Sequence, residues 1–235
     1  MQEVIQVNRI VIDQGLIKKA DNYLINDLSR KYELDVKDCN INIFGLFEND
    51  GNLDITINID NANVICNFIS YNTKDQNIKV NLNSENSKVE IYNSLVSIVP
   101  QKSIINILHN AKKTDSNVYN FAVTKDLGSV TFDVTSKVLK GMKNLVVNQE
   151  SKIISLNSSN NNKINPILLI DEFDAIAKHS AFIGKFKDQE VFYMQSRGIK
   201  KKDAYDLLLK GFLIGALKID EEEKNNIIKK YDNWR

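Results

Sequence analysis

The side chains of this chain that bind transition metals best belong to two histidines, His109 and His179, and two cysteines, Cys39 and Cys66. Neutral imidazole is a good ligand for iron, alone or in mixed sites with thiolates. Two histidines are too few for a three-histidine zinc site. His179, in the segment AKHSAFIG, is the residue that we expect to bind a metal. The alternative is a histidine at a strand end that only hydrogen-bonds to the backbone.

The cysteines do not have the spacing of a metal-binding pair, and a disulfide is not expected in a reducing compartment. Cys66, inside NVICNFI, is predicted to be a small buried hydrophobic residue. Cys39, between polar residues in KDCN, is expected to be exposed, and the sequence leaves open whether it handles iron or sulfur. His109 is predicted to pack a turn.

No catalytic residue is expected. The chain has no glycine-rich phosphate loop and no GxSxG element. Asp171, Glu172 and Asp174 are expected on both faces of one strand, so they do not form a carboxylate pair for acid–base catalysis.

Composition excludes further classes of function. The 235 residues carry 31 basic and 30 acidic side chains, a net charge of +1 that gives no long-range attraction for nucleic acid. No apolar run approaches the roughly 20 residues of a membrane span, and the first residues lack a signal-peptide core. We therefore expect a cytoplasmic protein that binds neither nucleic acid nor membrane.

A loose repeat begins at about residue 41. Alternating segments start at residues 52, 77, 103, 129 and 151, and each is followed by a polar turn and a second apolar run. Repeats of roughly 20–50 residues are typical of solenoids, whose units bury their apolar faces against their neighbours. Short strands favour a β-helix over residues 41–185, with Ile55, Val80, Ile105 and Val130 inward. The alternative is a β-sandwich with regularly spaced strands.

The two flanks of this core are predicted as separate regions, 1–40 and 186–235. In the first, we expect a strand near Ile5–Ile12 and a short amphipathic helix between Leu16 and Tyr32. In the second, a final strand closes at Gly184 and helices follow, which we expect to cap the end of the β-body.

Three helices are predicted in residues 186–235. Asp188 is placed to cap the first, which ends before Gly198. The second has Gly211 and Gly215 four residues apart, a spacing that allows close packing. The third begins at Asp220, and its apolar face carries Ile227, Ile228, Tyr231 and Trp234. This face either covers the β-body or binds a partner.

Four segments of the last quarter share a family pattern: the alternating strand after Pro166, AKHSAFIG around His179, EVFYMQSRGI, and DAYDLLLKGF. Weaker similarity extends upstream through HNAKKTDS and NQESKIIS. The composite pattern resembles the C-terminal signature of the SufB/SufD proteins, the scaffold subunits of the SUF iron–sulfur assembly system. The resemblance implies a right-handed parallel β-helix, and a longer N-terminal region that is here cut down or replaced.

The resemblance also implies a place for His179. In the family, the matching histidine lies where the SufB and SufD β-helices meet and the nascent cluster is proposed to form. Ser180 stands where SufB-type chains have glutamate and SufD-type chains have glycine. The cysteine that SufB-type chains use one coil upstream has no counterpart in residues 150–155, so the chain is nearer SufD.

By resemblance, the chain is a non-catalytic scaffold that pairs with a SufB-like subunit or with itself and holds an iron–sulfur cluster transiently. Its C-terminal helices would recruit a SufC-type ABC ATPase. The residues expected to contact these partners are Phe192, Tyr193, Arg197, Leu208 and Phe212. The alternatives are an ATPase-binding adaptor that has lost cluster assembly and a β-helix carbohydrate-active enzyme.

Overall fold

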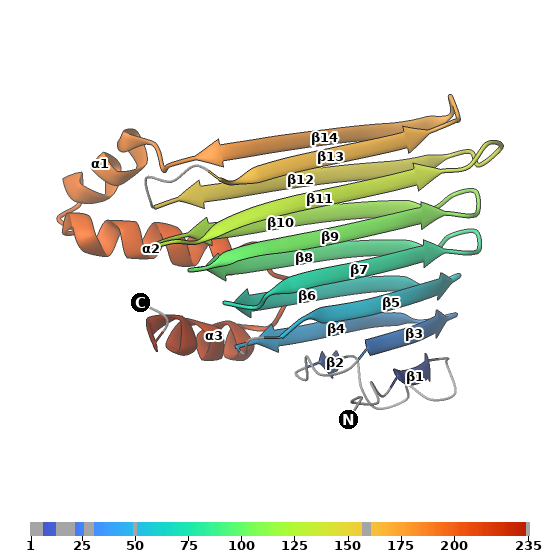
Figure 1. The fold of residues 1–235 in the computed structure, drawn as a ribbon, viewed down its shortest axis with the longest axis horizontal. Helices are drawn as coiled ribbons and strands as arrows, with labels where there is room; N and C mark the ends of the chain where they lie inside the picture. Colours follow the sequence, from blue (N-terminus) through green and yellow to red (C-terminus); the bar gives the residue numbers. More distant parts are fainter. Residues whose placement is uncertain (1–6, 13–21, 26–30, 49–50, 157–160, 234–235) are drawn as a thin grey trace.

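The computed structural model describes residues 7–12, 22–25, 31–48, 51–156 and 161–233 (Figure 1). The elements in this part of the chain are β1 (Val7–Ile12), β2 (Asn22–Ile25), β3 (Lys31–Lys37), β4 (Asn40–Phe47), β5 (Leu53–Asp60), β6 (Asn63–Tyr71), β7 (Asp75–Leu82), β8 (Lys88–Ser97), β9 (Pro100–His109), β10 (Asp115–Thr124), β11 (Ser129–Val138), β12 (Leu145–Ser155), β13 (Lys163–Ile170), β14 (Ala175–Gly184), α1 (Asp188–Ser196), α2 (Lys201–Ile214) and α3 (Glu221–Asn233).

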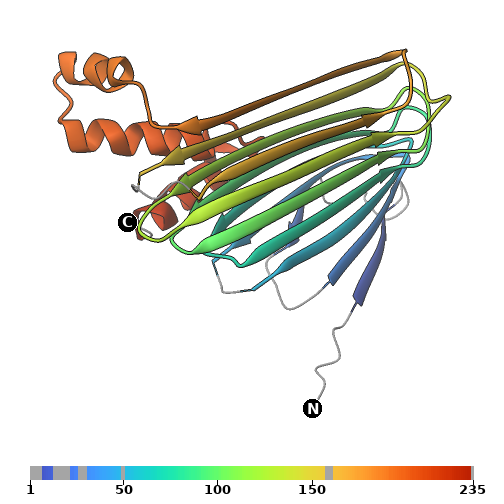
Figure 2. The same cartoon turned by 45° about the horizontal axis from the view of Figure 1, so that its top comes forward.

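The strands form two parallel sheets that face each other (Figure 2). The odd sheet has the order β1-β3-β5-β7-β9-β11-β13, and the even sheet has the order β14-β12-β10-β8-β6-β4-β2. The chain passes from one sheet to the other after every strand, so two consecutive strands make one coil. The predicted parallel β-helix with a helical C-terminal region is confirmed, and the β-sandwich alternative is wrong.

Alternation along the strands decides which side chains fill the space between the sheets. In β5 every second residue is buried, and parallel register stacks Ile55 on Ile78 and Ile78 on Ile105. Ile55, Val80, Ile105 and Val130 are all fully buried, as predicted. Each such side chain stabilises the coil stack by about 1.5–3 kcal/mol.

A row of buried polar side chains runs beside this apolar core. Asn93 Nδ2 lies 3.0 Å from Gln76 Oε1, 3.2 Å from Ser103 Oγ and 3.3 Å from Asn120 Oδ1. Asn120 in turn donates to Ser151 Oγ at 3.1 Å. Mutual hydrogen bonding offsets the cost of removing these amides and hydroxyls from water.

The prediction for the last repeat unit is wrong. The segment that starts at Ser151 is the second half of β12 in the even sheet, whereas those that start near residues 52, 77, 103 and 129 lie in the odd sheet. Asn148, Gln149 and Ser151 have the composition of a turn, yet they are buried side chains of one long strand. Polar residues buried within one strand were therefore interpreted as a turn between two strands.

Strands also replace the helix predicted between Leu16 and Tyr32. Where this stretch is described, Asn22–Ile25 is β2 and pairs with β4, and β3 begins at Lys31 and pairs with β5. The strand predicted near Ile5–Ile12 is present as β1. Both sheets thus continue across residue 40, while the proposed division into domains stays a prediction.

The turns at one corner of the coils use left-handed backbone. Asp38, Asn61, Asn86, Lys113 and Asn144 have φ of 51°, 48°, 64°, 56° and 57°. Short polar side chains tolerate this conformation best, because they can bond to the local backbone. Lys113 is the one residue of these five that is not asparagine or aspartate.

The helices lie along the side of the β-helix and do not cap its end (Figure 1). Apolar side chains of α2 and α3 pack on the outer surface of the even sheet, from Phe44 on β4 to Ile154 on β12. The cap prediction is therefore wrong. Ile227 and Tyr231 are buried in this contact, so of the two alternatives for the α3 face the structure favours the one in which it covers the β-body. Trp234 lies outside the described residues. A Cβ added at Gly211 would meet no atom within 4 Å, so no close helix packing occurs there.

Two buried polar side chains fasten the helices to the even sheet. Asn67 accepts from Lys218 N at 2.7 Å and donates to Lys218 O at 3.2 Å. Ser94 Oγ donates to Leu213 O at 2.7 Å. Because both are buried, the end of α2 and the α2–α3 link are held to the sheet.

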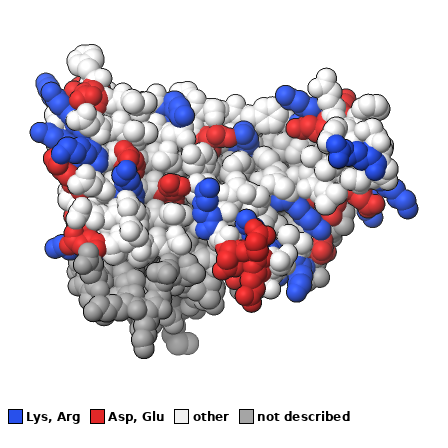
Figure 3. Space-filling view, turned by 180° about the vertical axis from the view of Figure 1, so that it is seen from behind, with Lys and Arg blue, Asp and Glu red and all other residues white. Residues whose placement is uncertain are grey.

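Basic and acidic side chains are interspersed over most of the face drawn in Figure 3. Ion pairs also join neighbouring coils, for example Lys31–Asp54 at 3.1 Å and Lys102–Asp133 at 2.8 Å. In the part of the chain that is described, no helix is long and apolar enough to span a membrane.

Candidate functional site

The coil made by β13 and β14 is the open end of the β-helix. Among the described residues, no strand lies beyond β13 in the odd sheet or beyond β14 in the even sheet (Figure 1). Their outer edges therefore expose backbone N–H and C=O groups that can pair with another strand. An uncovered edge of this kind is normally blocked by charge or covered by a partner.

The outer surface of this last coil is more apolar than that of the coil before it. Parallel register aligns Thr135 with Ile167, Lys137 with Leu169 and Lys152 with Phe182, so polar residues give way to apolar ones. Leu169 is 51% exposed, and Phe182 is 44% exposed. Ile176 is 70% exposed on the same coil. Exposed apolar side chains beside an open strand edge indicate a protein contact.

The carboxylates predicted on one final strand lie instead in the turn between β13 and β14. Asp171, Glu172 and Asp174 belong to this turn because the predicted strand is two strands. The Glu172 carboxylate accepts from Gly141 N and Phe173 N, both at 3.0 Å, and these bonds lower the pKa of that carboxyl group. Phe173 is fully exposed at the tip of the turn.

His179 lies in the middle of β14 and not at a strand end. It is aligned with Gln149 of β12 and is exposed, because no further coil covers it. His179 and Ser180 are the central pair of this ten-residue strand. A strand that pairs along the whole of β14 would therefore have its midpoint beside His179.

His109 is in a different environment, at the buried end of β9. Its Nδ1 lies 2.8 Å from Thr114 Oγ1 and its Nε2 lies 2.9 Å from Ser116 Oγ. Burial lowers the pKa of His109 to about 4. Both ring nitrogens are engaged, so His109 has the structural role predicted from the sequence.

Neither cysteine lies in the last coil. Cys66 is buried on β6, and burial raises the pKa of its thiol, so the thiolate is disfavoured. Cys39, expected to be exposed, is half-buried in the turn between β3 and β4 and packs against the core. Among the described residues, no group of three or more histidine, cysteine, aspartate or glutamate side chains could hold a metal ion.

The first helix presents a second exposed surface. Phe192 is 70% exposed and Tyr193 is 56% exposed, while the Arg197 guanidinium lies 4.7 Å from the centre of the Tyr193 ring. Aromatic and arginine side chains are the residues that most often dominate protein interfaces. These three predicted residues are brought together on and beside α1.

The remaining two predicted contact residues lie on α2. Phe212 packs edge-on against Phe121 and Phe186, with ring centres 5.3 and 6.1 Å apart, and so attaches α2 to the body. Leu208 is half-buried. Leu207, which is 46% exposed, was not among the predicted contact residues, and neither were Leu169, Ile176 and Phe182 of the last coil. The sequence alone does not show which of three consecutive leucines on α2 is exposed.

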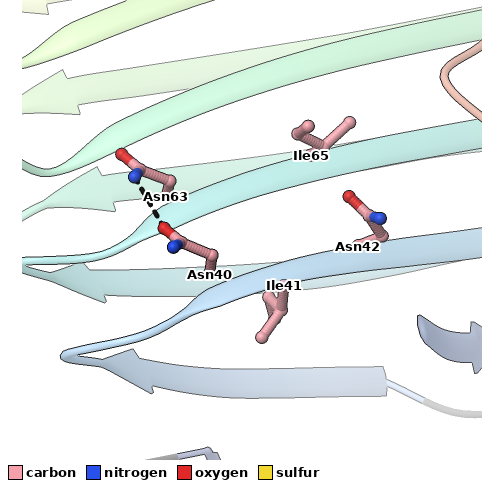
Figure 4. Close-up of a pocket in the computed structure, with 5 residues that line it drawn as sticks. All are labelled: Asn40, Ile41, Asn42, Asn63 and Ile65. Carbon is pink, nitrogen blue, oxygen red and sulfur yellow. Dashed lines mark hydrogen bonds between the residues drawn. The ribbon is translucent and has the colours of Figure 1, made fainter. Parts of the chain in front are cut away.

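A shallow groove of about 430 Å³ lies near the other end of the β-helix (Figure 4). It is lined by Asn40, Ile41, Asn42, Asn63 and Ile65, and Asn63 Nδ2 donates to Asn40 Oδ1 at 2.6 Å. None of these residues is a carboxylate or a base. The described residues of the groove therefore provide no acid–base pair of the kind that a carbohydrate-active enzyme needs.

Comparison with known proteins shows the family of this chain. A family model described as "SUF system FeS cluster assembly, SufBD core domain" matches residues 31–212. SufD of Bacillus subtilis (strain 168), an iron–sulfur cluster assembly protein, is 36% identical over 107 residues, which are 46% of this chain and 24% of that protein. A SufBD family protein of Pyrococcus horikoshii is 44% identical over 52 residues, 22% of this chain and 11% of that one.

A third relative, from Staphylococcus saprophyticus, is 23% identical over 107 residues, 46% of this chain and 23% of that protein. The matched segment is thus about a quarter or less of each relative's length. The family model covers most of the chain, including the open coil and α1. The chain therefore belongs to the SufB/SufD family of the SUF iron–sulfur cluster assembly system.

Proposed function

We propose that this chain is a non-catalytic, SufD-like scaffold subunit of a SUF-type complex that assembles iron–sulfur clusters. The observation that carries the proposal is the open apolar coil of β13 and β14 with His179 at its centre. The coil pairs with a SufB-like subunit or with a second copy of the chain. The surface around α1 recruits a SufC-type ABC ATPase.

Pairing through the open coil satisfies two needs at once. The free backbone edges of β13 and β14 gain hydrogen-bond partners, as in other cases of strand addition. The exposed side chains of Leu169, Ile176 and Phe182 leave water in the same step. A partner of the same fold offers a matching edge.

In this arrangement His179 supplies one ligand to the nascent cluster, which is cargo and not a resident cofactor. The position of His179 at the middle of β14 supports this role. Neither Cys39 nor Cys66 lies in the last coil, so the thiolates that a cluster also needs come from the partner subunit.

The ATPase chemistry belongs to the partner that binds α1 and α2. Closure of two ATPase subunits would move the helices of the two scaffold chains. Asn67 and Ser94 tie the end of α2 to the even sheet, so this motion reaches the β-helix and the open coil. We propose that this motion changes the contact between the open coil and the partner subunit, where the cluster forms.

The test of pairing is Leu169→Lys and, separately, Phe182→Lys, compared by sedimentation velocity with the matched control Thr135→Lys. Thr135 lies on the same outer face one coil away from the open end. Loss of a buried apolar side chain should weaken pairing roughly tenfold or more. Unchanged association of both variants, or equal weakening by the control, would refute the contact.

The test of cluster binding is His179→Ala in the assembled complex, with Ser180→Ala as control. His179 is exposed, so the free energy of unfolding of the variant should fall by no more than about 1.5 kcal/mol, the size of one net hydrogen bond. Iron and acid-labile sulfide retained after reconstitution should fall. A lower melting temperature with normal cluster content would show a structural role instead.

A second candidate function is an ATPase-binding adaptor without cluster assembly. The observation that favours it is the lack of a metal-binding group of three side chains in the described residues. The iron and acid-labile sulfide content of the wild-type complex distinguishes the two functions. An adaptor would bind the ATPase through Phe192 and Tyr193 but would retain no iron or sulfide.

A further inference from the structure

Gln149 bridges the two sheets directly beneath the open coil. Its side chain is 1% exposed, and its Nε2 donates to Ser136 Oγ at 2.9 Å and to Ile167 O at 3.3 Å. The carbonyl of Ile167 can only accept, so the amide orientation is fixed with nitrogen toward the odd sheet.

The other end of this amide has no partner. Gln149 Oε1 is buried and makes no hydrogen bond with any described residue. A buried amide oxygen left without a donor costs about 1–3 kcal/mol, and such atoms usually have a functional reason.

The residue stacked on Gln149 is His179. Parallel register forms a column through the even sheet of Cys66, Ile91, Val118, Gln149 and His179. The first three are apolar and buried, and only the last two are polar. Aligned residues of neighbouring parallel strands share one face about 4.8 Å apart, within reach of an amide and an imidazole.

We propose that Gln149 is a positioning residue for His179, whose imidazole N–H donates to the otherwise unpartnered Gln149 Oε1. The ring is exposed and reaches the amide by rotation about its side-chain bonds. A neutral imidazole has one N–H, so this bond holds one tautomer and leaves the other nitrogen free to bind metal. The inference rests on the proposed role of His179 as an iron or cluster ligand, because ligating histidines are oriented in this way by a second hydrogen bond.

The test is the tautomer ratio of His179 in protein labelled with ¹⁵N-histidine, read from the imidazole nitrogen shifts of the neutral ring. The chain has only two histidines, so His109, bonded to Thr114 and Ser116, is an internal reference. Wild type should strongly favour one tautomer. Gln149→Leu should move the ratio toward that of a free imidazole by about threefold to tenfold, as one net hydrogen bond implies.

The matched control is Gln101→Leu. Gln101 is also buried, donates through Nε2 to Thr73 O, and has an unpartnered Oε1, but it lies away from His179. This control should leave the His179 ratio unchanged, and Gln149→Glu, which keeps an acceptor oxygen, should retain the wild-type preference.

Two results would overturn the proposal: a mixed tautomer population for His179 in the wild type, alone and in the complex, or a ratio that Gln149→Leu does not alter. The first needs no variant, so a misfolded variant cannot obscure the answer. Cluster retention by the His179→Ala complex is a separate measurement. A failed cluster test with a positive tautomer result would reject the proposed function and leave the hydrogen bond standing.

Discussion

Replacement of His109 by glutamine should remove a specific part of the acid sensitivity of this fold. His109 is fully buried and bonded through both ring nitrogens to Thr114 and Ser116. Burial lowers its pKa to about 4, compared with about 6.5 for an exposed histidine. Glutamine has a similar reach and cannot take up a proton in this range.

The sign and size of the effect follow from proton linkage. Between pH 6.5 and pH 4 the unfolded chain binds a proton at residue 109 and the folded chain does not. The stabilisation by His109 is therefore complete above about pH 6.5 and is lost as the pH falls toward 4. A pKa difference of about 2.5 corresponds to about 3 kcal/mol, as an upper bound.

The assay is urea unfolding of wild type and His109→Gln from pH 7.5 to pH 4. Aspartates and glutamates titrate in both proteins, so the difference between their free energies of unfolding isolates His109. Wild type should lose about 2–3 kcal/mol more than the variant over this range. If the two curves stay parallel, or if the variant loses more, the burial argument for His109 is wrong.

Three further changes test other contacts. Lys113→Gly should be more stable than Lys113→Val by about 1–2 kcal/mol in thermal unfolding, because residue 113 has left-handed backbone; equal stabilities would contradict this. Asn67→Ala should lower the free energy of unfolding by about 1–3 kcal/mol and increase hydrogen exchange at Lys218, and unchanged exchange would show that the α2–α3 link is held otherwise. Phe68→Ala, in the core, should cost about 3–5 kcal/mol in urea unfolding, and a loss below 1 kcal/mol would mean that the site collapses.

The regular part of the β-helix could be predicted from sequence because inward apolar residues recur with each coil. Ile55, Val80, Ile105 and Val130 follow this rule and are all buried. The rule failed at residues 148–151, because a buried polar row has the composition of a turn. Pairing in that row depends on contacts between coils, such as Asn120 with Ser151, which no local pattern records.

The sequence predicted the three helices of the C-terminal region, but it did not predict where they pack on the β-helix. The third helix begins after Asp220, whose carboxylate accepts from Glu223 N at 2.7 Å. The predicted cap of the first helix is wrong, because Asp188 lies inside α1 and Lys187 is its N-cap residue. The side of the body that the helices cover depends on apolar residues on the outer face of strands, such as Phe44 and Ile69. In the sequence, an apolar residue on the outer face of a strand cannot be distinguished from one that faces the core. The contact of these residues with the helices could therefore be recognised only in the structure.

The same ambiguity explains why the open coil was not predicted from the sequence, which placed helices as a cap at this end of the β-helix. Ile167 and Leu169 alternate as in any strand, and nothing local shows that no coil lies beyond them. Once the fold places β13 and β14 at the end, three features coincide there: free strand edges, apolar residues in positions that are polar one coil earlier, and His179 above a buried, unpartnered amide oxygen. Each feature is costly in an isolated chain, and one event, the docking of another β-helix end, relieves the first two. Because the third lies at the middle of that same surface, covering the coil would exclude water from His179 and strengthen the proposed bond to Gln149, so assembly of the subunits and preparation of the metal ligand would be one step.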